Sequence, residues 1–336
     1  MNPRRLRFAL LILAGLLFAA PTPSFARWPI FGRSKIVIPF RIVKGTPVVS
    51  LSLNGKKGLN FVFDTGAVPM TLSSSAIAAA GLRTSPAKGS LKTPCGASPV
   101  HRLVPKMRVS GYGMKITGSA AVLDLSVPSR KVGIPIAGIF GYRAMLPQLP
   151  MLIDYQTQRI TFFLPRNSPH FQKSAEIPLE SLHAKKSKSA NPFIIAKLEL
   201  PDGRFVNANL EIDTGGAAAG LLLNTPFARK YGLLPSHPKA ADKEMTIGGV
   251  GGHTCALVRV SVPALIIGNQ KIAHPDAFSS RAPLGTSRAS GFDGQIGAAI
   301  LSHFRIFFGP HRHFVVFVPA KQNPPLPGRY VGLHSP

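Results

Sequence analysis

The chain has 336 residues, and 40 Lys and Arg against 13 Asp and Glu give it a formal net charge of +27. No apolar run reaches the length of a bilayer-spanning helix, which excludes a protein with several transmembrane helices. No stacking motif of aromatic and basic residues and no helix-turn-helix pattern indicates specific nucleic-acid binding.

The first 26 residues have the pattern of an export signal. Arg4, Arg5 and Arg7 precede an apolar stretch of 13 residues from Phe8 to Ala20, and small residues stand close to Ala26. This stretch is shorter than the roughly 20 residues that a membrane span needs, so we expect cleavage and export to the periplasm or the outside. An uncleaved N-terminal anchor is the alternative. The arginine pair fits twin-arginine export less well than general secretion.

The chain after the signal begins with strand patterns. Residues 47–53 alternate in the way typical of a β-strand, and an Asn54-Gly55 turn signal follows. Residues 59–63 form the next strand pattern and lead into the tripeptide Asp64-Thr65-Gly66. A short helix is predicted just after it, over residues 73–80.

The same order of features recurs in the second half of the chain. Residues 192–198 form a strand pattern, a Pro201-Asp202-Gly203 turn signal follows, and residues 206–212 lead into Asp213-Thr214-Gly215. A short helix is again predicted after the tripeptide, over residues 225–231. One such tripeptide would be a weak signal, but two in matching frames indicate an internal repeat.

Further matches define the predicted domains. Val104–Met107 is similar to Val262–Leu265, and each half ends in a hairpin-like stretch. We therefore predict a mainly β protein with two similar, closed β-barrel-like lobes related by internal duplication. The expected boundaries are 1–26 for the signal peptide, 35–165 for the N-terminal lobe, 166–174 for the linker, 175–318 for the C-terminal lobe and 319–336 for a disordered Pro-rich tail.

Two carboxylates delivered by strands into tight glycine turns suit paired-aspartate chemistry. If Asp64 and Asp213 lie close together in a poorly solvated cleft, both cannot ionise cheaply, so one keeps its proton. The charged member can take a proton from a water that attacks an amide carbonyl, and the protonated member can stabilise the developing oxyanion. This chemistry requires no metal and no cofactor. For a single tripeptide, a strand-to-turn connection with a solvated aspartate would be the better interpretation.

The repeat resembles the aspartic peptidases of the pepsin and retropepsin type over roughly residues 35–318. It is most similar to a bacterial secreted group with both lobes in one polypeptide, which implies the acid protease fold. In that family a hydrophobic-hydrophobic-Gly element supports each Asp-Thr-Gly turn. Ile139-Phe140-Gly141 and Gln295-Ile296-Gly297 fit this role, although Gln295 replaces an apolar residue.

The resemblance also implies roles for the turn residues. Thr65 and Thr214 should form crossed hydroxyl-to-backbone hydrogen bonds that lock the two turns together. Gly66 and Gly215 should keep backbone amides close to the carboxylates.

The position after each turn departs from many relatives, which carry Ser or Thr bonded to the outer oxygen of the carboxylate. Here it holds Ala67 in the first lobe and Gly216 in the second. The missing hydroxyls predict raised pKa values for the pair and activity at milder acidity.

Two segments are predicted to form flaps over the cleft and to bind substrate. Gly96 and Ala97 lie at the tip in the first lobe, and Gly249, Val250 and Gly251 lie at the tip in the second. Glycine permits the positive φ angles that hairpin tips use. The second tip has the glycine content of a phosphate loop, but no Lys-Ser/Thr pair or helical pattern follows it.

The only two cysteines occupy nearly the same place in the repeat, inside the predicted flaps. In an oxidising compartment Cys95 and Cys255 could form a bridge between the flaps. Two separate thiols are the alternative, because the sequence does not provide the Cα spacing that a disulfide needs.

Together these observations predict an exported aspartic-type endopeptidase that acts on peptide or protein substrates as a monomer. The excess of basic residues is typical of solubility or of adaptation to an acidic exterior, or it attracts the protein to an anionic envelope surface. Two other functions stay open. One is a catalytically silent peptide- or polyanion-binding protein of the envelope with the same fold, and the other is an adhesion module driven by charge.

Overall fold

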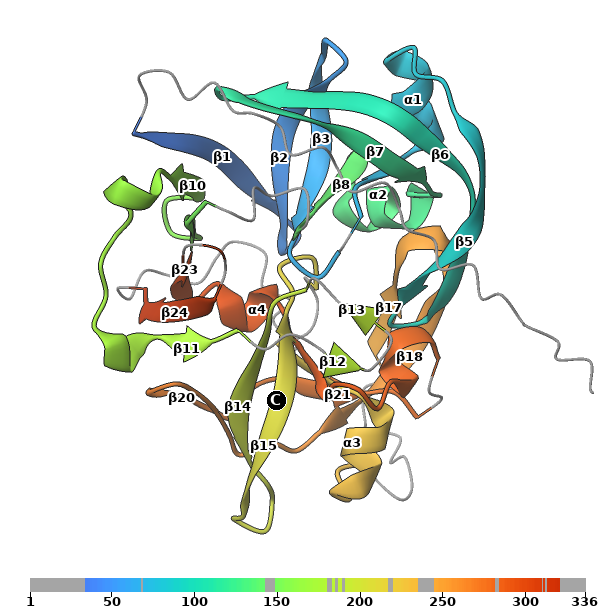
Figure 1. Cartoon of the computed structure of the whole chain (residues 1–336). Coiled ribbons are helices and arrows are strands. Elements are labelled where there is room, and N and C mark those ends of the chain that lie inside the picture. Colours follow the sequence, from blue (N-terminus) through green and yellow to red (C-terminus); the bar gives the residue numbers. More distant parts are fainter. Residues whose placement is uncertain are drawn as a thin grey trace, which may run out of the picture.

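The computed structural model describes residues 34–67, 69–142, 149–179, 191–216, 220–234, 245–281, 284–309, 311 and 313–320, and the backbone of 183–184 and 187–188. The prediction of a mainly β protein is confirmed, and its sheets are curled (Figure 1). Within these ranges no helix is long and apolar enough to cross a membrane. The predicted signal peptide, residues 1–26, lies outside the described residues, as does the predicted tail beyond residue 320.

The N-terminal half, residues 34–163, contains the strands and the helix predicted from its sequence pattern. Helix α1 (Ser74–Ala79) begins after Ser73, whose hydroxyl accepts a hydrogen bond from the backbone N–H of Ala76. The second helix is α2 (Ser126–Val132). The strands are β1 (Lys35–Val43), β2 (Thr46–Leu53), β3 (Lys56–Asp64), β4 (Thr71–Leu72), β5 (Ser85–Thr93), β6 (Gly96–Gly111), β7 (Met114–Val122), β8 (Gly138–Gly141), β9 (Met151–Asp154) and β10 (Arg159–Phe163).

A connecting segment leads to the C-terminal half, residues 191–320. It contains the 3-10 turns η2 (Pro165–Asn167) and η3 (Lys173–Ala175) and the short strands β11 (Ile177–Pro178), β12 (His183–Ala184) and β13 (Ser187–Lys188). The predicted linker at 166–174 falls within this segment.

The C-terminal half also has the predicted strands, and helix α3 (Thr225–Lys230) confirms the helix predicted at 225–231. Its last strand continues to Pro319, one residue into the predicted tail, because Pro319 pairs with Phe304. The other elements are α4 (Ala298–Leu301), η4 (Val250–Gly252) and η5 (Gly285–Arg288). The strands are β14 (Phe193–Glu199), β15 (Phe205–Ile212), β16 (Leu221–Leu223), β17 (Met245–Gly248), β18 (Thr254–Val260), β19 (Ala264–Ile267), β20 (Gln270–Ala273), β21 (Ala277–Ser279), β22 (Gly294–Ile296), β23 (Phe304–Phe308) and β24 (Phe314–Pro319).

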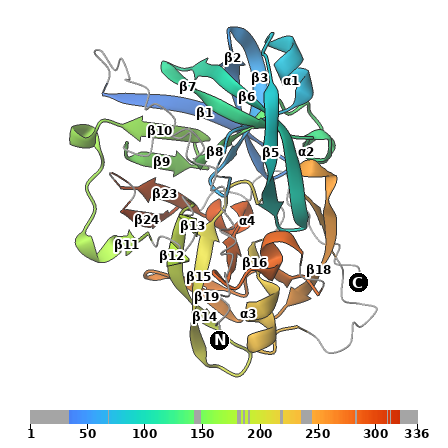
Figure 2. The ribbon, with the colours of Figure 1, turned by 45° about the vertical axis from the view of Figure 1, so that its right-hand side comes forward.

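The larger sheet runs through both halves. Its order is β11-β24-β23-β9-β10-β1-β2-β3-β8-β4-β7-β6-β5, so the terminal hairpin of each half pairs with the other through β9 and β23. These strands lie between the two halves (Figure 2). The sequence predicts the two hairpins but not their pairing. The second sheet, β17-β18-β21-β16-β22-β15-β14-β19-β20, belongs to the C-terminal half alone.

In each half, the strand that leads to an aspartate has a parallel neighbour. Strand β3 pairs with β8, with Asp64 opposite Gly141, and β15 pairs with β22, with Glu211 opposite Gln295. Strands β4 and β16 run antiparallel along the other side of β8 and β22. Strands β2 and β14 pair along the other sides of β3 and β15, so each aspartate stands at the end of a strand that is held on both sides within a sheet.

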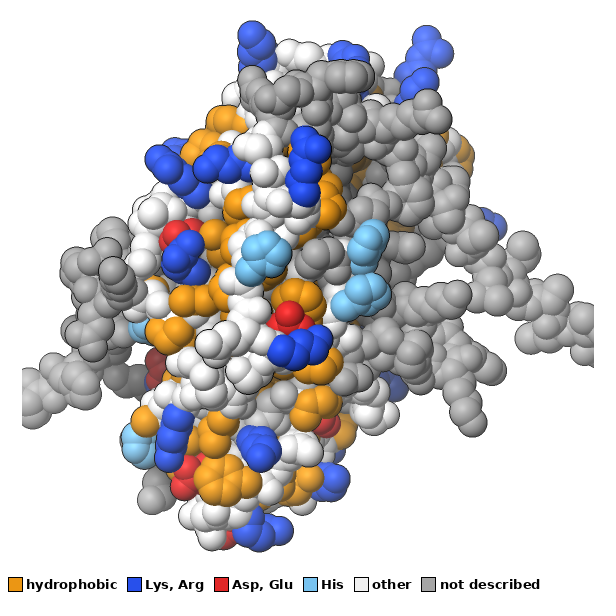
Figure 3. All heavy atoms as spheres, turned by 60° about the vertical axis from the view of Figure 1, so that its left-hand side comes forward, with side chains coloured by type: hydrophobic (Ala, Val, Ile, Leu, Met, Phe, Trp, Pro, Cys, Tyr) orange, Lys and Arg blue, Asp and Glu red, His pale blue; other side chains and the backbone are white. Residues whose placement is uncertain are grey.

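Basic side chains are spread over the surface. In Figure 3, Lys and Arg extend along the whole visible face, with only a few Asp and Glu among them. This distribution agrees with the excess of 40 basic over 13 acidic residues.

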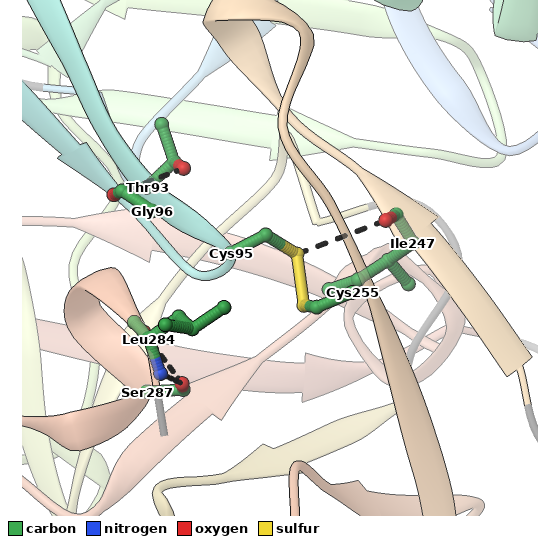
Figure 4. Close-up of a disulfide and its surroundings, with 7 residues drawn as sticks. All are labelled: Thr93, Cys95, Gly96, Ile247, Cys255, Leu284 and Ser287. Atoms are coloured by element: carbon green, nitrogen blue, oxygen red, sulfur yellow. Dashed lines mark hydrogen bonds between the residues drawn. A yellow bond between two sulfur atoms is a disulfide. The ribbon is translucent and has the colours of Figure 1, made fainter. Parts of the chain in front are cut away.

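The tips of two hairpins from opposite halves are joined by a disulfide. The β5–β6 hairpin reaches down to the β17–β18 hairpin (Figure 1), where Cys95 and Cys255 are bonded with their Cα atoms 5.2 Å apart (Figure 4). Beside the bond, Oγ of Ser98 donates a hydrogen bond to the carbonyl oxygen of Val250 at 2.8 Å. Of the two alternatives that the sequence left open, the structure contains the bridge.

We expect the native protein to contain no free thiol, and two after denaturation and reduction. Replacing both cysteines with serine should lower the free energy of unfolding by about 2–4 kcal/mol, because the bond restricts the unfolded chain between positions 160 residues apart. Thiol titration and urea denaturation measure the two effects. Two reactive thiols in native protein prepared without reductant would contradict the bridge.

Candidate active site

The two Asp-Thr-Gly turns lie against each other between the halves. Asp64 is the last residue of β3, and Asp213 directly follows β15. A Cβ atom on Gly66 would lie 2.7 Å from Cγ of Asp213, and a Cβ atom on Gly215 would overlap the carboxyl group of Asp64. Each turn therefore requires glycine, because the aspartate of the other turn occupies the space of a side chain.

The two threonines exchange hydrogen bonds across the halves. The hydroxyl of Thr65 donates to the carbonyl oxygen of Ile212 at 2.6 Å, and the hydroxyl of Thr214 donates to that of Phe63 at 2.9 Å. The backbone N–H of each threonine donates to the hydroxyl oxygen of the other at 3.0 Å. Both side chains are fully buried. These are the crossed bonds that the resemblance implies, and they join the turns into one unit.

Backbone amides hold the inner oxygen of each carboxyl group. Oδ1 of Asp64 accepts hydrogen bonds from the N–H groups of Gly66 at 2.8 Å and Ala67 at 3.1 Å. Oδ1 of Asp213 accepts the two equivalent bonds in its own turn, both at 2.9 Å. The orientation of both carboxyl groups is thus set by the turn backbone.

The outer oxygen of Asp213 has a side-chain partner that the sequence analysis did not assign. Nε2 of Gln295, in β22, donates a hydrogen bond to Oδ2 of Asp213, and Gln295 is buried. Gly216 has no side chain, but the outer oxygen is nevertheless bonded, so the raised pKa values expected from the missing hydroxyls have burial as their first cause. In the sequence, the signal for this contact was that Gln295 stands where an apolar residue is expected.

A third acid, which the sequence analysis missed, lies beside the pair. Glu211 precedes Asp213 by two positions, so their side chains leave the chain on the same side. Nδ2 of Asn191 donates both to Oε1 of Glu211 and, at 2.8 Å, to the carbonyl oxygen of Gly66. Burial raises the pKa of Glu211 to about 8, with the Asn191 hydrogen bond opposing and the charge of Asp64 adding to the increase. The sequence signal for this third acid was a glutamate between apolar residues at the end of a strand.

Burial also raises the pKa of both aspartates. The increase is larger for Asp213, because the charges of Asp64 and Glu211 add to the effect of burial. For Asp64, the hydrogen bonds from Asp213 and from the turn amides oppose burial. Each carboxyl group lies against the glycine of the other turn. Two buried carboxyl groups with raised pKa values favour a state in which the pair shares one proton.

Tyr155 adds a buried hydroxyl near the pair. It follows β9 and is 1% exposed, and its hydroxyl has no hydrogen-bond partner among the described residues. Burial and the charges of Asp213 and Asp64 raise its pKa above the ordinary value, so the phenol stays neutral. In the same described part of the chain, no group of three or more His, Cys, Asp and Glu is arranged to hold a metal ion.

The structure brings the predicted flap residues of the two halves together. Nε2 of His253 lies 3.1 Å from the carbonyl oxygen of Ala97, and the N–H of Gly251 donates to the carbonyl oxygen of Asp124 at 3.0 Å. A cavity of about 870 Å³ lies beside Gly251, between α2 and β6, and neither Asp64 nor Asp213 lines it. The flap residues concerned are Gly96, Ala97, Gly249, Val250 and Gly251.

Thr65→Val should lower the free energy of unfolding by about 2–4 kcal/mol. The change leaves the N–H of Thr214 and the carbonyl oxygen of Ile212 unpaired in the interior, and each lost partner costs about 1–3 kcal/mol. Thr65→Ser is the matched control, because it keeps the hydroxyl. Urea denaturation compares the two variants, and equal stability would contradict the role of the crossed bonds.

Glu211 should make stability depend on pH. Its pKa rises from 4.5 to about 8 on folding, so the unfolded chain loses the proton first as the pH increases. The stabilisation by the neutral acid is therefore complete below pH 4.5 and is lost between 4.5 and about 8, at no more than about 1.4 kcal/mol per pH unit. Glu211→Gln should flatten this part of the curve in urea denaturation at several pH values. An unchanged slope would refute the shift.

A comparison with protein-family models matches part of the N-terminal half. A model described as aspartyl protease matches residues 49–144, which include the Asp64 turn, the β5–β6 hairpin and β8 and make up less than a third of the chain. No curated protein matches the chain. The family-model match supports assignment of the protein to an aspartyl protease family.

Proposed function

We propose that the protein is an exported aspartic-type endopeptidase with two lobes, residues 35–165 and 175–318, related by internal duplication. The family match suggests peptidase activity. The observation that carries the proposal is the approach of Asp64 and Asp213 across one pair of bonded turns. Of the two Asp-Thr-Gly turns, the match includes only that of Asp64, so the role of Asp213 rests on this geometry.

The proposed mechanism uses the unequal protonation of the two aspartates. The Asp64 carboxylate takes a proton from a water molecule, whose oxygen attacks the carbonyl carbon of the peptide bond. The proton on Asp213 forms a hydrogen bond to the carbonyl oxygen as negative charge develops there. When the carbon–nitrogen bond breaks, the proton taken by Asp64 passes to the leaving nitrogen. No covalent bond between enzyme and substrate forms.

The proposed substrate is an extended peptide that lies between the halves, under the joined hairpins. An extended chain can add its backbone to exposed strand edges, which gives main-chain affinity with little dependence on sequence. Gly96, Ala97, Gly249, Val250 and Gly251 would cover such a chain. The glycines leave the backbone of the tips accessible to it.

Two observations support export. The Cys95–Cys255 bond is of the kind that persists in oxidising compartments such as the periplasm and the cell exterior. The apolar N-terminal segment of the sequence has the order expected of a signal peptide. The basic surface in Figure 3 would hold an exported protein close to an anionic envelope.

One observation favours the second candidate, a peptide- or polyanion-binding protein with the same fold. The hairpin tips are joined by a covalent bond and by the Ser98–Val250 and His253–Ala97 contacts, and Asp213 is only 8% exposed. A protein whose cover stays closed would retain a peptide without cutting it. Cleavage separates the two candidates.

Asp64→Asn and Asp213→Asn should each reduce cleavage of a denatured protein by about 10²- to 10⁴-fold, because each removes one proton-transfer group. Both aspartates have a pKa above 3.8, so activity should extend from acidic pH toward neutral pH. Initial rates across this range, with a statine-type inhibitor as a second test, measure both effects. Asp202→Asn, in an exposed turn, is the control for the aspartate change.

Unchanged cleavage in either site variant would refute the pair. Absence of cleavage by the wild type, combined with saturable peptide binding, would favour the second candidate.

A further inference from the structure

Strand β22 differs from its counterpart β8 at the position next to the aspartate strand. In the N-terminal half, Val62 of β3 stands opposite Ile139 of β8, and both pack in one apolar cluster. In the C-terminal half, Glu211 of β15 stands opposite Gln295 of β22. One half thus places two polar side chains where the other places two apolar ones. Gln295 is 8% exposed and Glu211 is 7% exposed, so solvation does not explain the change.

The amide of Gln295 is directed at a reacting group. Its Nε2 donates to Oδ2 of Asp213, the oxygen that the turn amides leave unbonded. The backbone is fixed at Gln295, which pairs with Glu211 on one side and Leu222 on the other. It is also fixed just after it, because the N–H of Asp213 donates to the carbonyl oxygen of Ile296 at 3.0 Å and the N–H of Gly297 donates to that of Gly220 at 2.8 Å. The amide therefore reaches Asp213 from a rigid strand.

Gly216 is matched to this contact. A Cβ atom at this position would lie 2.8 Å from Oδ2 of Asp213 and 3.3 Å from Nε2 of Gln295. A side chain after the turn would therefore compete with the amide for the same space. The glycine makes room for a hydrogen bond that comes from the neighbouring strand instead of from the turn.

We propose that Gln295 is a positioning residue that holds the carboxyl group of Asp213 through its outer oxygen. This inference rests on the proposed function, in which Asp213 carries the proton. The oxygen of a protonated carboxyl group can still accept a hydrogen bond. Because the amide of Gln295 donates from one side, the acid proton of Asp213 is kept on the other side. There it can meet Asp64 and the substrate oxygen.

A neutral donor suits the charges around Asp213. The titratable groups that influence Asp213 or are influenced by it are Asp64 of β3, Glu211 of β15 and Tyr155 after β9. A Lys or Arg at position 295 would stabilise both carboxylates in the ionised state and remove the shared proton. Glutamine orients the acid without adding a charge.

Three variants test the proposal in the full-length protein. Gln295→Met keeps the length of the side chain but removes the donor, so kcat should fall about 10- to 100-fold with KM within about twofold. Gln295→Glu restores a donor when protonated, so it should be more active than Gln295→Met at acidic pH and lose activity as the pH rises. Gln270→Leu, on β20, is the control for removing an amide and should have wild-type kinetics.

A second measurement does not require turnover. The chain has eight aspartates, so selective ¹³C labelling of aspartate carboxyl carbons gives few NMR signals, and Asp213→Asn assigns one of them. The amide of Gln295 stabilises the charged form of Asp213 by donating a hydrogen bond to it. Without this donor, the titration of Asp213 should move to higher pH in Gln295→Met but not in Gln270→Leu. Near-UV circular dichroism verifies that each variant is folded.

The outcomes separate the two proposals. A wild type that does not cleave refutes the proposed function, and a moved Asp213 titration in Gln295→Met would still support the contact. If the wild type cleaves but folded Gln295→Met has wild-type kcat and an unmoved titration, the positioning role is wrong. If kcat falls equally in Gln295→Met and Gln295→Glu at acidic pH, with no shift of the titration, the residue is structural and the proposal is also wrong.

Discussion

The exchange of hydrogen bonds between Thr65 and Thr214 is the constraint on which the rest of the site depends. Each hydroxyl accepts from the other turn and donates to a strand carbonyl of the other half. Neither turn can satisfy its buried polar groups without the other, and unpaired buried groups are costly. The position of each aspartate is therefore defined only in the assembled molecule. Because of this mutual dependence, the site is also a structural joint between the two halves.

The electrostatics of the site follow from the small number of acidic residues in the chain and from the burial of three of them. Three of the 13 acidic residues, Asp64, Asp213 and Glu211, meet between the halves, while 40 basic residues occur along the chain. In this setting protonation is the means of avoiding repulsion between buried like charges. The groups that bind the acids are neutral: turn amides, Asn191 and Gln295. A proton can therefore remain inside the site at a pH where an isolated carboxyl group would have lost it.

Much of this organisation could be predicted from the sequence because it is local. The strands before Asp64 and Asp213 follow strand patterns in the sequence, and helix α1 begins after Ser73, which caps it. Pairing between β9 and β23 could not be predicted, since partners far apart in the chain leave no local signal. An acid such as Glu211 near the end of a strand is usually exposed, so its burial depends on Asn191, which comes from a different segment. For Gln295 the deviation from the pattern was visible, but its target was not.

The covalent link between the β5–β6 and β17–β18 hairpins has a consequence for motion. Hairpins that cover a cleft from opposite sides can ordinarily swing apart independently, each on its own hinge. Here a displacement of Cys95 is transmitted directly to Cys255, so both tips have to travel together as one arch. Under the proposed function, a peptide that enters below the joined tips would have to slide in lengthwise or wait for both tips to lift together. Such an entrance would admit an unfolded polypeptide more readily than a folded domain.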